Sequence, residues 1–304
     1  MLLIAMALTN VAQISVGFKD SPYGKMSKFK PGDLEGLKKT TTVFVLPNNM
    51  DDAMLQSYEK IIGEVWKYTP FKVVQSNERK AYEGKSEYSL FAFETAERQI
   101  HYNNVWEYQH FYYYQLTTRV GKKMKVYAEV AMPLPLTLFD SKNNDNGQQY
   151  MPYSMLGGYF KCYLMVINNY LNNEIVYSNA DDRDDKEALK QLANETLYVT
   201  ESMMTYSTRF STKLKSYTEE EFFKKYPYPH KLTNTRELSE LILDSPKPVY
   251  FYNFVHVEGS RTYLAVYNSK SNEMVITTSS KNSDCQPGDM HWLANQIEKA
   301  IKGK

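Results

Sequence analysis

The chain has only two cysteines in 304 residues, Cys162 and Cys285, and they do not form a CxxC pair. This spacing excludes a zinc ribbon and a thioredoxin-type redox site. Two interpretations stay open: a disulfide in an oxidising compartment, or two buried free thiols, because cysteine packs as a small hydrophobe. Cys162 lies within an amphipathic helix pattern, so we favour packing over a role as a nucleophile.

An excess of charge is also missing, since 36 Lys and Arg residues balance 35 Asp and Glu residues and leave a net charge of +1. Nucleic-acid-binding domains usually carry a basic excess that neutralises phosphates. After the first residues, no apolar run reaches the roughly 18 residues that a membrane helix requires. We therefore predict no nucleic-acid partner and no integral membrane protein.

Short motifs that carry chemistry are missing as well. The histidines show no HxH or HxxxH spacing, and there is no GxSxG, GxGxxG or Walker sequence. Gly157-Gly158 is too short to indicate a phosphate loop, and the acidic residues of 143–147 lack EF-hand spacing. We predict no metal, no cofactor and no recognisable catalytic residue. The histidines are His101, His110, His230, His256 and His291.

The N-terminus does carry a signal. Residues 2–8 are a short apolar run of the length of a signal-peptide core, followed by small and polar residues up to Ser15. We predict a leader over 1–15, cleaved near Ala12 or Ser15, and an exported protein, periplasmic or extracellular. The alternative is a buried apolar strand at the N-terminus.

Hydrophobic periodicity predicts an α/β (α+β) protein. Residues 41–178 and 196–304 both indicate the order β-α-β-α-β-β-β-α, which favours a tandem duplication of one small unit. Each unit is expected to have a mixed or antiparallel sheet with helices mainly on one face. Residues 16–40 are expected to be an extended segment, and 179–195 an acidic linker. Predicted helix starts are Asp51 or Asp52, Thr218, Thr235 and Asp289.

The stretch Thr42–Pro47, the helix after it and Trp66–Val74 resemble a group of uncharacterised exported bacterial proteins, as do Tyr226–Tyr228 and Tyr267–Lys270. Each half also resembles, in pattern only, the small α/β domain of the TolB N-terminal region and of CsgG. The resemblance implies a cell-envelope setting and no established activity. Neither the β-propeller of TolB nor the membrane strands of CsgG are present.

One aromatic constellation stands out, in a chain with 26 tyrosines. Strand alternation places its five members on one face. They are Trp106, Tyr108, His110, Tyr112 and Tyr114. This face could hold a sugar ring or a peptide, with His110 as a polar contact. We favour packing under the helix predicted over 158–171, because aromatic residues enrich strands for packing reasons.

The sequence alone does not assign a function. Our best hypothesis is a non-enzymatic exported protein that binds an envelope protein or a small carbohydrate or peptide ligand. The alternative is a hydrolase that acts on envelope or environmental polymers, with a site assembled from distant residues.

Overall fold

The computed structural model describes residues 14–16, 29, 32–48, 50–102, 105–120, 123–132, 156–175, 184–208, 211–258, 261–280 and 284–303. Within these ranges, the side chains of 95–102, 105–112, 120, 123, 206–208, 211–214, 256–258, 261 and 279–280 are not described. The acidic loop at 143–147 and the apolar run at 2–8 lie outside the described residues.

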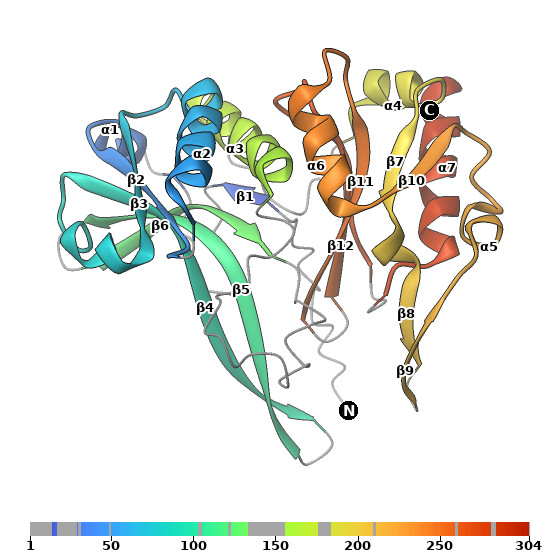
Figure 1. The fold of residues 1–304 in the computed structure, drawn as a ribbon, viewed down its shortest axis with the longest axis horizontal. Helices are drawn as coiled ribbons and strands as arrows, with labels where there is room; N and C mark the ends of the chain where they lie inside the picture. The colour runs from blue at the N-terminus through green and yellow to red at the C-terminus, as the bar shows by residue number, and fades with distance from the viewer. Residues whose placement is uncertain are drawn as a thin grey trace, which may run out of the picture.

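The first half forms a six-stranded mixed sheet with the order β1-β6-β5-β4-β2-β3 (Figure 1). Strand β2 pairs in parallel with β3 and β4, whereas the other neighbours are antiparallel. The strands are β1 (Ile14–Val16), β2 (Thr41–Leu46), β3 (Phe71–Gln75), β4 (Tyr88–Tyr102), β5 (Val105–Val120) and β6 (Lys123–Ala131).

The second half forms a five-stranded mixed sheet with the order β10-β7-β11-β12-β13. Strand β7 pairs in parallel with β10 and β11, and β12 is antiparallel to both of its neighbours. The strands are β7 (Leu197–Thr200), β10 (His230–Thr233), β11 (Tyr250–Glu258), β12 (Arg261–Asn268) and β13 (Met274–Ser280).

The two sheets share one topology once β1 is set aside. The order β3-β2-β4-β5-β6 corresponds strand by strand to β10-β7-β11-β12-β13, with the same parallel and antiparallel pairs. The predicted α/β class with mixed sheets is confirmed. The tandem duplication itself stays a prediction, which superposition of the halves would test.

Some helices lie between the two sheets, and others lie on the far side of the second sheet. The helices are α1 (Asp33–Lys38), α2 (Asp52–Val65), α3 (Gly157–Asn172), α4 (Lys186–Leu192), α5 (Glu219–Phe223), α6 (Thr235–Asp244) and α7 (Pro287–Ile301), with 3-10 turns η1 (Ser76–Ala81) and η5 (Glu201–Met204). One hydrophobic cluster joins α1, α2, α3 and α6 to the facing sides of both sheets. A second cluster places α4, α5 and α7 on the opposite side of the second sheet. In Figure 1, α2 and α3 lie above the first sheet, and α7 lies at the far side of the second.

Helix α3 explains how the halves join. It is buried around most of its circumference, as a helix between two layers must be. Its Tyr159 ring packs edge-on against Phe251, and the Asn253 side-chain amide donates to the Tyr163 hydroxyl over 3.0 Å. The second sheet has helices on both faces, whereas the sequence predicted helices mainly on one face, because α3 of the first half packs there together with α6.

Several local predictions need correction. Residues 16–40 contain the helix α1, because Leu34 and Leu37 are spaced to bury on one side. The N-caps of α6 and α7 are Asn234 and Gln286, one and three residues before the predicted starts.

The N-terminal boundary also bears on the predicted leader. Strand β1 begins at Ile14 and is buried against β6. A cut near Ala12 would keep all of β1, whereas a cut after Ser15 would remove two of its three residues.

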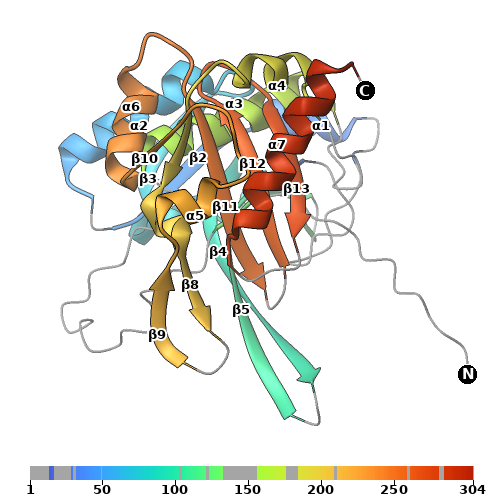
Figure 2. The same ribbon diagram turned by 90° about the vertical axis from the view of Figure 1, so that its right-hand side faces the viewer.

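Two β-ribbons extend beyond the sheets. Strands β4 and β5 pair with each other out to Tyr102 and Val105, whereas the pairing of β5 with β6 begins only at Tyr113. The second ribbon, β8 (Thr205–Thr208) with β9 (Ser211–Ser216), was not predicted. Both ribbons project from the same side of the molecule, as Figures 1 and 2 show.

Candidate functional site

The predicted aromatic face lies on β5, and most of it lies on the ribbon. Backbone pairing sets Tyr112 opposite Thr95, His110 opposite Glu97, Tyr108 opposite Gln99 and Trp106 opposite His101. The side chains of these four β5 residues lie outside the described residues.

Tyr114, the fifth member of that face, is a core residue. Its ring stacks on Phe91 with centroids 5.4 Å apart and meets Phe160 of α3 edge-on at 6.4 Å. Burial raises the pKa of its phenol far above the ordinary value. The contact with α3 agrees with the packing interpretation for Tyr114.

A pocket of about 380 Å³ lies on the outer side of α7. Its volume is within the roughly 300–1,000 Å³ typical of small-molecule sites. We call it the α7 groove. It is lined by Trp292, Asn295, Gln296, Glu298, Lys299 and Lys302.

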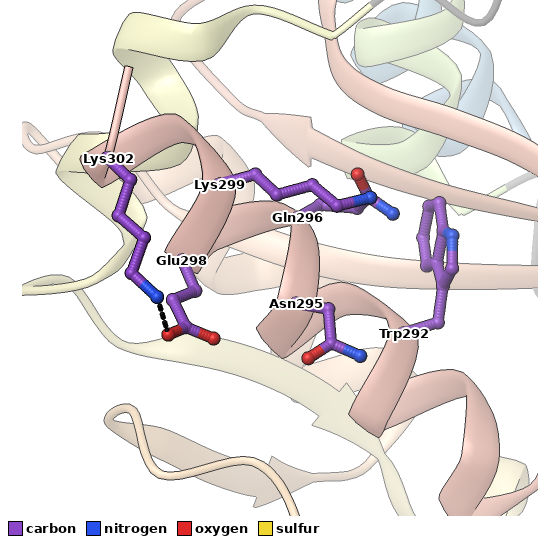
Figure 3. A pocket seen from close by; sticks show the side chains of 6 residues that line it. All are labelled: Trp292, Asn295, Gln296, Glu298, Lys299 and Lys302. Carbon is purple, nitrogen blue, oxygen red and sulfur yellow. Dashed lines mark hydrogen bonds and ion pairs between the residues drawn. The ribbon is translucent and has the colours of Figure 1, made fainter. Parts of the chain in front are cut away.

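Helical spacing gathers these side chains on one flank of α7. Positions i, i+3, i+4 and i+7 from Trp292 share a face. Figure 3 shows Trp292 at one end of the groove and Glu298 with Lys302 at the other, while Gln296 and Lys299 extend in the direction of the indole. The groove therefore combines an aromatic surface with two carboxamides and an amine.

Two of the three charged side chains in the α7 groove form an ion pair, and the third is not part of it. Glu298 and Lys302 form an ion pair at the exposed end. Among the described residues, Lys299 has no ion-pair partner. Burial raises the pKa of the neighbouring Tyr228 phenol, and the Glu298 carboxylate adds to this rise. The groove as a whole keeps one uncompensated positive charge.

The opposite face of α7 holds the groove in place. Leu293 and Ile297 are fully buried against the second sheet. The helix begins with a capping box, in which the Asp289 carboxylate accepts from the Gln286 backbone N–H over 2.8 Å, and Pro287 occupies the first turn. These features give the groove a rigid base.

A second polar group occupies the outer face of the first sheet, and we call it the sheet-face row. Glu129 is 2% exposed and accepts a hydrogen bond of 2.7 Å from the Gln115 amide. Burial raises the pKa of the neighbouring Tyr113 to about 12, with added contributions from Glu129 and Glu94. Glu94 itself accepts from Arg79 over 2.6 Å. The row thus places a phenol near two carboxylates.

The described cysteines and His230 pack against neighbouring side chains. Cys162 and Cys285 are both free and buried in different clusters, which agrees with the thiol interpretation. His230 stacks on Phe223 at 3.9 Å, and His291 is exposed on α7. Within the described part of the chain, no three His, Cys, Asp or Glu side chains are placed to hold a metal ion, and no helix is long and apolar enough to cross a membrane.

Sequence reasoning identified α7 by its core stripe and missed the groove on the other side. The available signal was Trp292, an indole on the polar face of an amphipathic helix, followed at helical spacing by Asn295, Gln296 and Lys299. Comparison with protein-family models, curated proteins and solved structures finds no match for this chain.

Proposed function

We propose that this protein is a non-enzymatic binding protein and that the α7 groove holds its small polar ligand. The observation that carries the proposal is the combination of Trp292 with Asn295, Gln296 and Lys299 on one rigid helix flank. Such sites use an apolar surface for contact and a few polar groups for orientation.

The chemistry of the groove favours binding over turnover. Carboxamides donate and accept hydrogen bonds but neither carry a proton in general acid–base catalysis nor act as nucleophiles. The Glu298 carboxylate is already engaged by Lys302.

Ligand-observed NMR on the purified chain tests this function. Neutral monosaccharides, uronic acids and dipeptides form the panel, and each is also measured against Trp292→Ala. We expect at least one class to show saturation transfer that Trp292→Ala abolishes. If no class binds, or if every binder is indifferent to Trp292→Ala, the function is not located in the α7 groove.

The export part of the proposal depends on residues 2–8 and on their resemblance to a signal-peptide core. Expression with the native N-terminus, followed by N-terminal sequencing of the secreted chain, tests it. We expect cleavage at or before residue 13, which keeps β1 intact. Retention of Met1 in a cytoplasmic fraction would contradict export.

The hydrolase alternative has one supporting observation, the sheet-face row with Glu94, Tyr113 and Glu129. Paired carboxylates are the groups that glycoside hydrolysis uses. Assays on chromogenic glycosides with the wild type and Glu94→Gln distinguish the two functions. Turnover that Glu94→Gln removes would favour the hydrolase.

A further inference from the structure

We infer that the ligand of the α7 groove is an anionic sugar: a pyranose ring that carries a carboxylate. This inference rests on the proposed function and adds the chemical class of the ligand.

The indole supplies the first part of the argument. Trp292 is only partly buried, although it is the largest apolar side chain on the outer flank of α7. One side of it packs on the second hydrophobic cluster. The flat C–H face of a pyranose ring is apolar enough to cover the rest of an indole, whereas its edge presents hydroxyl groups. A sugar ring therefore matches an aromatic surface that is bordered by polar groups.

The two carboxamides supply the second part. Each amide offers two donors and one acceptor oxygen. A sugar hydroxyl both donates and accepts, so Asn295 and Gln296 can each bind a hydroxyl without placing a charge against it. Both are partly buried and lie three and four residues after Trp292, about one turn along the same flank.

The positive charge of Lys299 is the reason to expect an anionic ligand. Cations near a helix C-terminus are stabilised by the helix dipole, and this accounts for Lys299 and Lys302 as far as the helix is concerned. It does not account for the orientation of Lys299, which extends along the groove toward Trp292 (Figure 3). Lys302 is neutralised by Glu298, so the charge left to a ligand is that of Lys299. Charge complementarity then selects a carboxylate over a neutral substituent.

The size of the groove restricts the ligand further. A volume of about 380 Å³ on a single helix accommodates one or two rings, not a folded partner. A single uncompensated amine also differs from the several cations that a nucleic-acid backbone requires.

Titration calorimetry with three probes tests the inference on the full chain: glucuronate, glucose and N-acetylaspartate. Amide NMR shifts of Asn295 and Gln296 report the site. We expect glucuronate to bind about tenfold more tightly than glucose, the gain of one charge-assisted contact. Lys299→Gln should remove the preference for glucuronate over glucose, and Trp292→Ala should weaken both sugars.

The matched control is Lys60→Gln, an exposed lysine on α2, the helix that packs on the first sheet. It should leave all three affinities unchanged. Equal binding of glucuronate and glucose would overturn the anionic class and leave the proposed function standing. Preference for N-acetylaspartate would overturn the sugar class. Absence of binding by all three, with no shift of Asn295 or Gln296, would overturn the inference and count against the groove.

Discussion

Gly158 donates its backbone N–H to the Ser239 hydroxyl over 2.9 Å and so joins the first turn of α3 to the middle of α6. A Cβ atom at Gly158 would lie 2.4 Å from the Ser239 carbonyl oxygen and 2.9 Å from its Cα. Glycine is required here for close approach of two backbones, not for a special conformation. The contact joins an element of the first half to one of the second.

Substitution of Gly158 by Ala is therefore expected to destabilise the whole chain. Overpacking of a tight contact costs about 1–3 kcal/mol, and here the obstacle is backbone that cannot rotate away. Denaturant unfolding measures the loss. Gly36→Ala in α1 is the control, because nothing lies within 4 Å of its Cβ position. It should stabilise by about 0.5–1 kcal/mol. Equal midpoints for Gly158→Ala and the wild type would contradict the close contact.

Thr42→Val should also destabilise the first half. The Thr42 hydroxyl lies 2.6 Å from that of Thr69 and 2.9 Å from that of Ser89, all buried. Removing it leaves buried hydroxyls short of a partner, at a cost of about 1–3 kcal/mol. Thr41→Val is the control on the same strand, where the side chain is only partly buried. Thermal unfolding compares them, and similar melting temperatures would argue against the network.

Two capping carboxylates are expected to respond to pH in opposite directions. Burial raises the pKa of Asp289 in the α7 capping box. The folded state therefore favours the protonated Asp289 side chain. The stability that this group contributes is lost as the pH rises through its pKa in the folded state. Hydrogen bonds from Thr218 lower the pKa of Glu221 in the α5 box. Stability from Glu221 is lost as pH falls through its folded pKa.

Unfolding of Asp289→Asn and Glu221→Gln at pH 4 and pH 7 measures both effects. Relative to the wild type, Asp289→Asn should gain stability between pH 4 and pH 7, and Glu221→Gln should lose it. Parallel pH profiles for the two variants would show that their environments do not differ as described.

The Gln115 and Glu129 pair should behave as a coupled unit. Removing one partner of this buried hydrogen bond is expected to cost about 1–3 kcal/mol, because the remaining polar group loses a partner at a site shielded from water. Gln115→Leu, Glu129→Leu and the double variant form a double-mutant cycle. We expect the double variant to be less destabilised than the sum of the singles. Additive losses would mean that the two side chains act independently.

Local sequence patterns predicted much of the fold. Asp51 and Thr218 cap α2 and α5 as expected, because capping depends on a side chain and a backbone N–H three residues apart. The order of strands and helices in each half followed from periodicity. The caps of α6 and α7 were misplaced because Asn234 and Gln286 precede stronger-looking candidates.

Ribbons and surfaces were harder to predict. The pairing of strand β4 with β2 ends at Phe91, and β4 continues to Tyr102 by pairing with β5 alone. Such pairing depends on the partner strand, so the residues of β4 alone do not show how far that strand extends.

By itself, the sequence determined most of the helices and strands that the two halves share and which side of each is apolar, because these depend on residues a few positions apart. Only the tertiary structure decided which faces stay open. Helices α3 and α7 each follow the last strand of their half, but α3 is enclosed by the second sheet, whereas the outer flank of α7 is left to Trp292, Asn295, Gln296 and Lys299. That difference arises from the stacking of the two halves, a contact between residues far apart in the chain, which no local pattern encodes.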